Sequence, residues 1–502
     1  MIAIVLTLLV AVVTTIYYYS KVKYSFWKKH NIPYIEPHLP YGNIKGVGRT
    51  LHSSQLTHKF YKQLKGSGPF AGIYLFTKPV ILALDLEFVK TILIKDFNYF
   101  QDRGLYFNER DDPISAHLFS VDFARWKVLR AKLTPTFTSG RMKFMFQTIV
   151  DVADNFQKCL AGMVDGNENF ELKDVLSRFT TDVIGTCAFG INCNSLTDPN
   201  AEFRTMGKRV FDHGSTSGML KHFFKSAFKH LAITLRMRAV DKDVSTFFLG
   251  IVKETVEYRE KNDVKRNDFM DLLIQLKNHG TLDGADVGKL SLNEIAAQAF
   301  VFFIAGFETA STTLSFILYE LSINKHLQER ARQEIHTVLA KHNGQFTYEA
   351  MMSMNYLGQC IHESLRKYPP GNLIRTNVNK EYPIPNTDIV MPKESLVIVP
   401  VYAIHHDTDY YTNPDEYNPD RFEPEEVKKR HPQTFMPFGD GPRNCAGVRF
   451  GMMQIRIGLV TLLKNFEFSL CDRTIMPIRF APGNLVLSIE HDLWLNVKNI
   501  AN

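Results

Sequence analysis

The chain has 502 residues, of which 45% are hydrophobic and 22% are charged. This composition is typical of a globular protein, and a mean hydropathy of −0.14 excludes a transporter with many membrane spans. The net charge of +7 is too dilute for the dense basic surface that binds nucleic acid. Six scattered cysteines without a C-x-x-C pair predict neither a disulfide framework nor a zinc knuckle.

The N-terminal run MIAIVLTLLVAVVTTIYYYS is uncharged and long enough to cross a bilayer as one helix. A cleaved signal peptide is the alternative, but no basic residue precedes the run and bulky tyrosines end it. Four lysines follow between positions 21 and 29, and the positive-inside rule then puts the rest of the chain in the cytosol. We therefore predict a membrane anchor at 1–20, a basic and proline-rich hinge at 21–41, and one catalytic domain at 42–502.

This domain is predicted to be mostly α-helical with small β-sheets, an α+β fold. Alternating apolar runs predict one pair of strands at 71–76 and 79–84, and a second pair at 388–391 and 395–401. Residues 292–323 are apolar nearly all round, which predicts a buried helix through the centre of the domain.

The segment FGDGPRNCAG, residues 438–447, runs directly into a helical pattern. A cysteine at a helix N-terminus meets free backbone N–H groups and the positive end of the helix dipole, both of which favour the thiolate. Glycines at 439, 441 and 447 remove side chains where a flat ligand would approach the backbone. A lone cysteine is more often structural, but these surroundings suit a cysteine-ligated haem.

In this segment the chain resembles the cytochrome P450 superfamily, whose F-x-x-G-x-R-x-C-x-G signature it matches at every fixed position. The resemblance implies the P450 fold, and it implies that Cys445 is the axial ligand of the iron in haem b. It also implies cofactor contacts from Phe438, Gly439 and Arg443.

The central helix contains AGFETAS, residues 305–311. Ala305 and the glycine after it lack bulk, so the helix can pass close to a flat cofactor. An acid followed by a hydroxyl can relay protons, and a buried acid is costly unless it has a function. The resemblance implies that Glu308 and Thr309 deliver protons for the activation of dioxygen, and that Ala305 lies against the haem.

Two further motifs are weak alone but lie in the order expected for the family. ESLR spaces Glu363 and Arg366 so that they meet on one helix face, which in isolation would be an ordinary surface pair. The resemblance implies that both join Arg421 of the NPDRFEP segment in a buried structural network. Disruption of this network would cause the protein to lose its haem. WKVLR matches the W-x-x-x-R pattern of the family, and the resemblance implies that Trp126 and Arg130 contact the haem propionates.

Further propionate contacts are implied for Arg443 and for Arg375. Phe300, Phe303 and Phe307 share one face of the central helix and are predicted to wall a pocket for an apolar substrate. A basic and apolar stretch at 218–238 resembles the lid that touches the membrane in microsomal members.

Stretches at 133–140, 178–191, 265–276 and 438–445 together resemble the insect microsomal detoxification members of the sixth P450 family. This implies a monooxygenase of the endoplasmic reticulum membrane, with its catalytic domain in the cytosol. It would use O2 and take NADPH electrons from cytochrome P450 reductase, with cytochrome b5 as a second donor. The substrate would be a small lipophilic molecule, such as an insecticide, a plant toxin or a hormone-like lipid.

Positive side chains beside Trp126 are predicted to face the acidic reductase, because opposite charge speeds encounter. They are Arg125, Lys127 and Lys132. Two alternatives stay open: an isomerase or dehydratase of the same fold that does not use O2, and a membrane-tethered binding protein without catalysis. The Glu308 and Thr309 pair argues against both, because neither needs a proton relay.

Overall fold

A computed structural model describes residues 2–500 except 165–168, 212–220, 222–223, 226–227, 267 and 283–284. Part of the predicted lid at 218–238 therefore lies outside the described residues. The chain divides into two compact units. The first comprises Met1–Gly104, Gly371–Thr412 and His431–Asn444, and the second comprises Leu105–Pro370, Asn413–Arg430 and Cys445–Asn502.

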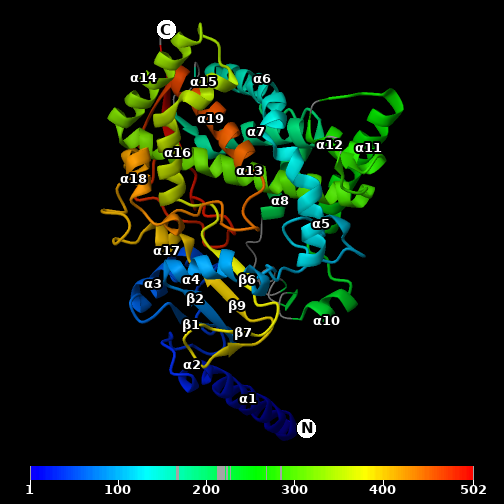
Figure 1. Cartoon of the computed structure of the whole chain (residues 1–502), viewed down its shortest axis with the longest axis vertical. Coiled ribbons are helices and arrows are strands. Elements are labelled where there is room, and N and C mark those ends of the chain that lie inside the picture. The colour runs from blue at the N-terminus through cyan, green and yellow to red at the C-terminus, as the bar shows by residue number, and fades with distance from the viewer. Residues whose placement is uncertain are drawn as a thin grey trace. The chain divides into compact units, whose positions relative to one another are not determined.

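A four-stranded sheet with the order β1-β2-β9-β6 organises the first unit (Figure 1). β1 (Phe70–Leu75) and β2 (Lys78–Ala83) are antiparallel neighbours, so the first predicted strand pair is confirmed. β9 (Leu396–Val399) runs parallel to β2 and antiparallel to β6 (Ile374–Asn377).

The second predicted strand pair is wrong in its pairing, although both strands exist. β8 (Val390–Met391) pairs with β7 (Tyr382–Pro383) and not with β9. β9 has the apolar sequence LVIV and lies between two other strands, as a central strand does. Its neighbours come from distant parts of the chain, which local alternation does not report.

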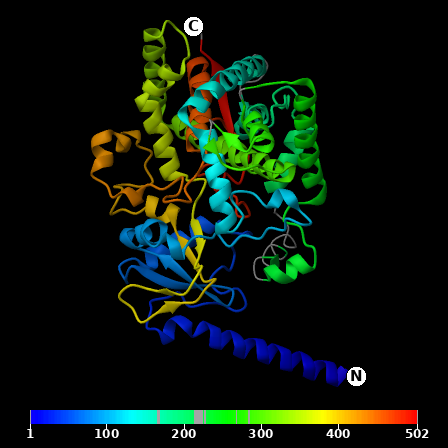
Figure 2. The same cartoon turned by 45° about the vertical axis from the view of Figure 1, so that its right-hand side comes forward.

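The predicted membrane anchor at 1–20 overlaps α1 (Ile2–Tyr24), which continues into the first residues of the predicted hinge. α1 is exposed except at Ser20 and Tyr24. The helical stretch Ile2–Lys29 is long and apolar enough to cross a membrane. In Figures 1 and 2, α1 extends away from the sheet of its own unit.

The predicted hinge lies against β1. α2 (Phe26–Lys29) carries Trp27, which is fully buried and donates from Nε1 to the Ile73 carbonyl at 3.1 Å. The chain that follows pairs with β1 at Tyr34, where the carbonyl of Pro33 accepts from the Gly72 N–H at 2.8 Å. It then turns back at 38–42, where His38 and Gly42 exchange backbone hydrogen bonds of 2.8 Å. The other helical segments of this unit are α3 (Ser53–Leu64), α4 (Leu86–Lys90), η1 (Thr91–Lys95), η2 (Phe97–Tyr99), α17 (Val401–His405) and η7 (Pro432–Thr434).

The second unit is built around α13 (Leu292–Ile323), which confirms the predicted central helix at its predicted bounds. The helix begins with a capping box, in which the Ser291 hydroxyl and the Glu294 side chain each accept from the other residue's backbone N–H. It packs against α7 (Leu172–Ile184), α11 (Lys242–Asn262) and other helices of the same unit (Figure 1). Its apolar sequence is therefore that of a core helix.

The remaining segments of the second unit are α5 (Phe123–Leu133), α6 (Ser139–Val164), α8 (Glu202–Phe211), α10 (Lys229–Thr234), α12 (Phe269–Asn278), α14 (Lys325–Lys341), α15 (Tyr348–Ser353), α16 (Asn355–Lys367), α18 (Pro424–Lys428), α19 (Val448–Asn465) and the short turns η3 (Pro113–Ser115), η4 (Thr134–Phe137), η5 (Gly185–Phe189) and η6 (Pro419–Phe422). Its strands are β3 (Asn169–Glu171), β4 (Thr281–Leu282), β5 (Ala285–Asp286), β10 (Phe466–Ser469) and β11 (Trp494–Asn499). The order β10-β11-β3 makes one sheet and β4-β5 makes another, so the predicted class of helices with small sheets is confirmed.

Gly72→Ala tests the attachment of the anchor segment to β1. A Cβ at this position would lie 2.3 Å from Cγ of Trp27, so the buried indole must move. We expect a loss of about 1–3 kcal/mol in the free energy of unfolding. Gly250→Ala in α11 is the control, because nothing lies within 4 Å of its Cβ position. Equal denaturant midpoints for the two variants would contradict this packing.

Candidate functional site

Cys445 is exposed, and it differs in this from the other five cysteines. Burial raises the pKa of the Cys187, Cys193 and Cys360 thiols, which suits a structural role. Cys445 lies just before α19, whose N-cap is Gly447. The sulfur is thus accessible to a ligand at the entrance to a helix.

Arg130 of α5 lies near this sulfur within the second unit. Burial lowers the pKa of the Arg130 guanidinium, and the charge of Cys445 opposes that shift. Trp126, one turn earlier on α5, is buried and stacks on Phe123 with ring centroids 5.7 Å apart. The structure therefore brings Arg130 close to Cys445, while the Trp126 ring is part of the packing of α5.

The first seven residues of the signature segment, 438–444, belong to the first unit. Gly439 and Gly441 have φ values of +72° and +68°, which glycine adopts without strain. A Cβ on Gly441 would lie 2.0 Å from the Leu93 carbonyl oxygen. Phe438 is half-buried at the start of this turn. The glycines are thus required by the fold of the segment itself.

Two arginines of the first unit are among the predicted cofactor contacts. Arg443 approaches Asp102 with its Nη2 3.4 Å from Oδ1, and its carbonyl accepts from Arg103 at 2.9 Å. Arg375 of β6 has a buried Nε that makes no hydrogen bond among the described residues, and burial lowers the pKa of its guanidinium. An anionic group would satisfy such a cation.

One stretch of α13 is open although the helix is otherwise a core element. Ala305 is exposed, and Thr309 one turn later is half-buried. The Thr309 hydroxyl donates to the Ala305 carbonyl at 2.5 Å. A small residue and a hydroxyl therefore share an accessible face, where a flat group can lie against the helix.

Glu308 does not share that face. Its carboxylate oxygen Oε1 lies 3.3 Å from the Nζ of Lys173 on α7, and it accepts from the Thr312 hydroxyl at 3.4 Å. Adjacent residues of an α-helix project about 100° apart, since 3.6 residues make a turn. The predicted acid and alcohol therefore lie on different sides of α13.

The structure brings Glu363, Arg366 and Arg421 together in the second unit. Glu363 and Arg366 have side chains with no exposed area, and Arg366 donates to the carboxylate from Nε at 2.7 Å and from Nη2 at 2.8 Å. Arg421 of η6 lies 3.4 Å from the same carboxylate. The backbone N–H of Asn418 adds a further hydrogen bond at 2.9 Å.

The three predicted pocket phenylalanines are buried on α13. Phe303 and Phe307 are stacked, with ring planes 7° apart. Phe303 also meets the rings of Phe203 and Phe248, at 5.0 and 5.2 Å between centroids, and Phe300 meets Phe248 at 5.2 Å. The rings form one aromatic cluster of α8, α11 and α13.

The three cations expected to meet a redox partner differ in their availability. Lys127 is exposed. Arg125 is bonded to Glu109, and its Nη2 lies 3.6 Å from Glu294. Lys132 is buried and donates to the Lys289 carbonyl at 2.7 Å, so it is not available at a docking surface.

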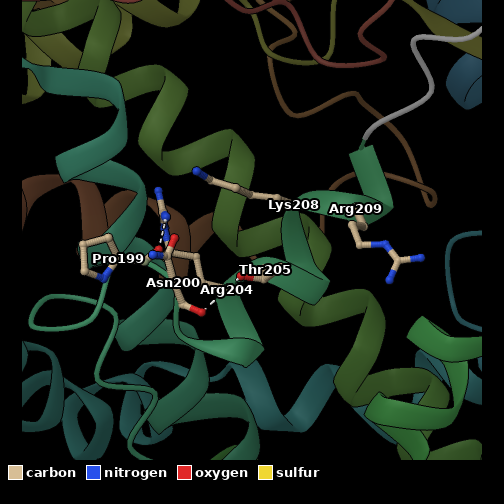
Figure 3. A pocket seen from close by; sticks show the side chains of 6 residues that line it. All are labelled: Pro199, Asn200, Arg204, Thr205, Lys208 and Arg209. Carbon is tan, nitrogen blue, oxygen red and sulfur yellow. Dashed lines mark hydrogen bonds between the residues drawn. The ribbon is translucent and has the colours of Figure 1, made fainter.

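An open hollow lies beside α8, lined by Pro199, Asn200, Arg204, Thr205, Lys208 and Arg209 (Figure 3). None of the predicted site residues lines it. Its cations are paired with acidic residues of the same unit: Arg204 and Lys208 contact Asp174, and Arg209 contacts Asp243. We do not assign the reaction to this hollow.

Comparison with known proteins matches the Cytochrome P450 family model to residues 33–495. Probable cytochrome P450 6a14 of Drosophila melanogaster is 44% identical, over 98% of this chain and 99% of its own length. Cytochrome P450 6A1 of Musca domestica is 43% identical, over 96% and 95%. Cytochrome P450 6a9 of Drosophila melanogaster is 45% identical, over 99% and 100%.

Glu363→Ala tests the buried network. The substitution leaves the Arg366 guanidinium buried without its carboxylate, so we expect the free energy of unfolding to fall by about 3–5 kcal/mol. Glu425→Ala removes an exposed partner 2.7 Å from Lys428 and should cost at most about 1 kcal/mol. Chemical unfolding of both variants measures the difference. Similar losses in the free energy of unfolding would show that the buried pair stabilises the fold no more than the exposed pair does.

Proposed function

Because this chain belongs to the cytochrome P450 family of haem monooxygenases, we propose that it oxidises small lipophilic molecules with electrons that a reductase takes from NADPH. The observation that carries this proposal is the exposed Cys445 beside Arg130 at the entrance to α19. A thiolate there is accessible to a metal, and a neighbouring guanidinium favours its charged form.

The residues of the chain fit a haem. In the second unit, the open stretch at Ala305 offers a surface for a flat ring, with Cys445 as the iron ligand and Trp126 and Arg130 as propionate partners. In the first unit, the buried Nε of Arg375 makes no hydrogen bond among the described residues, as expected of a group that binds a carboxylate. Arg443, Phe438 and Gly439 complete the proposed cofactor contacts.

A thiolate-ligated haem, when bound, would favour cleavage of the O–O bond, because the sulfur donates electron density to the iron. The chain's own part is to hold and move protons. The Thr309 hydroxyl, on the open face of α13, is the group that we assign to donate a proton toward dioxygen, and Glu308 is the acid that resupplies it. The network of Glu363, Arg366 and Arg421 fixes the surrounding chain. Disruption of this network should therefore also cause the protein to lose its haem.

The substrate class follows from apolar side chains. We propose that the aromatic cluster of Phe300, Phe303 and Phe307 forms a rigid wall toward an apolar ligand. Insecticides, plant toxins and hormone-like lipids share the required chemistry.

We propose that α1 anchors the chain in the endoplasmic reticulum membrane with both units in the cytosol. Residues 42–502 then act as the haem domain. Of the predicted docking cations, the exposed Lys127 and the partly exposed Arg125 are the groups that we assign to a reductase surface, with cytochrome b5 as a second partner.

Isotope labelling tests the reaction class. The full-length protein, reconstituted in lipid with reductase and NADPH, should convert a panel of lipophilic compounds to products that contain one atom of 18O from 18O2. Product formation without NADPH would instead indicate an isomerase or dehydratase. Ligand binding without consumption of NADPH would indicate a binding protein.

Thr309→Ala tests proton delivery. We expect product formation to fall by roughly 100-fold, the lower end of what a positioned proton donor contributes, while NADPH oxidation continues and yields hydrogen peroxide. Thr313→Ala is the matched control, because its hydroxyl makes the same bond to a carbonyl one turn earlier, at 2.8 Å. Full coupling of NADPH to product in Thr309→Ala would contradict the role.

A further inference from the structure

A short segment of the first unit, residues 100–104, lies along the outer side of β6. β6 is the last strand in the order β1-β2-β9-β6, and Asp102 is the bridge partner of Asn377 on it. The Asn377 N–H donates to the Asp102 carbonyl at 2.7 Å. The side-chain oxygen of Asn379 accepts from the backbone N–H groups of Gln101 and Asp102, at 2.7 and 3.1 Å. These bonds use backbone groups of the segment, so its place on β6 does not depend on the Asp102 carboxylate.

Asp102 and Arg103 hold Arg443 at two points. Nη2 of Arg443 lies 3.4 Å from Oδ1 of Asp102, and Nη2 of Arg103 donates to the Arg443 carbonyl at 2.9 Å. The Arg443 side chain is 10% exposed and that of Asp102 is 19% exposed, so water and salt screen this pair less than they screen a surface pair. One neighbour thus holds the guanidinium, and the other holds the backbone from which it projects.

The Asp102 carboxylate is itself held in place. Its Oδ2 accepts from the side-chain nitrogen of Asn379, while its Oδ1 faces Arg443. A guanidinium has five N–H donors in a planar fork, so it can bind more than one carboxylate. Arg443 can therefore meet the carboxylate of a ligand without leaving Asp102.

The same pairing brings Asp102 to the face of β6 that carries Arg375. Alternate residues of a strand point to one face, so Arg375 and Asn377 share a face. Bridge partners lie opposite each other with their side chains on the same face, which places Asp102 there as well. Gly104 fits this register, because a Cβ on it would lie 2.2 Å from Nδ2 of Asn377. Arg375 and the carboxylate that contacts Arg443 therefore occupy one face of the sheet edge.

We propose that Asp102 is a positioning residue, which holds the Arg443 guanidinium on the Arg375 face of β6 before the haem carboxylates bind. The inference rests on the proposed function and specifies what places the arginine of the signature segment. An arginine that is already held loses less side-chain freedom when it binds a ligand. Asp102 would thus strengthen the retention of haem without touching it.

Haem transfer from the full-length, haem-loaded protein to an excess of apomyoglobin tests the proposal. Asp102→Asn removes the charge, and it keeps the size of the side chain and the backbone bonds to β6. We expect it to lose haem several-fold faster than the wild type, and Asp102→Glu, which keeps the charge, to lie closer to the wild-type rate. Asp409→Asn is the matched control, because this carboxylate of the same unit is 68% exposed and contacts Lys65. An unchanged rate in Asp102→Asn would overturn the proposal.

A double-mutant cycle separates positioning from a general effect on the fold. If Asp102 acts through Arg443, Asp102→Asn should cause no further acceleration of haem loss in an Arg443→Gln background. Equal acceleration in both backgrounds would overturn the proposal. So would a loss of the fold in Asp102→Asn, measured by chemical unfolding, that Arg443→Gln does not share. Failure of the proposed function would appear separately, as a wild-type protein without the spectrum of a thiolate-ligated haem.

Discussion

The second unit depends on one fully buried ion pair, Glu363 with Arg366. Burying two charges costs several kcal/mol for each ion, and only complete hydrogen bonding offsets that cost. The guanidinium meets this condition with two bonds to the carboxylate and further bonds from Nη2 to the Pro414 and Glu416 carbonyls. The pair therefore ties α16 to the chain that follows Asn413, and that chain has little freedom to rearrange.

A second constraint acts on α13, which is a core helix and also offers an open face. Its apolar residues bury the helix along most of its length, yet Ala305 in the middle is exposed. A bulky side chain there would close this face. The same stretch has Thr309 on the open side and Glu308 toward α7, so the two groups that we propose for proton delivery occupy separate surroundings.

Local patterns in the sequence predicted much of this arrangement. A long stretch that is apolar nearly all round predicted the bounds of α13, and alternating apolar residues predicted that β1 pairs with β2. The i,i+3 spacing of Glu363 and Arg366 predicted that their side chains meet. Each of these signals lies within a few residues, where helix or strand geometry fixes the neighbours.

Contacts between distant segments could not be predicted in this way. β9 pairs with strands that are remote in sequence, which no local pattern reports. Lys132 is an ordinary surface lysine by sequence, and only the path of the chain near Lys289 buries it. Lys173 has no local motif that would single it out, because its partner Glu308 lies on another helix. Burial and long-range ion pairs are properties of the packed chain.

The most direct test of the central claim is the carbon monoxide difference spectrum of the reduced, membrane-expressed protein, measured beside Cys445→Ala. A thiolate ligand predicts a strongly red-shifted Soret band for the wild type and the loss of that band in the variant. A band at the position of free or histidine-ligated haem in the wild type, or an unchanged spectrum in Cys445→Ala, would contradict the assignment of Cys445 as the iron ligand.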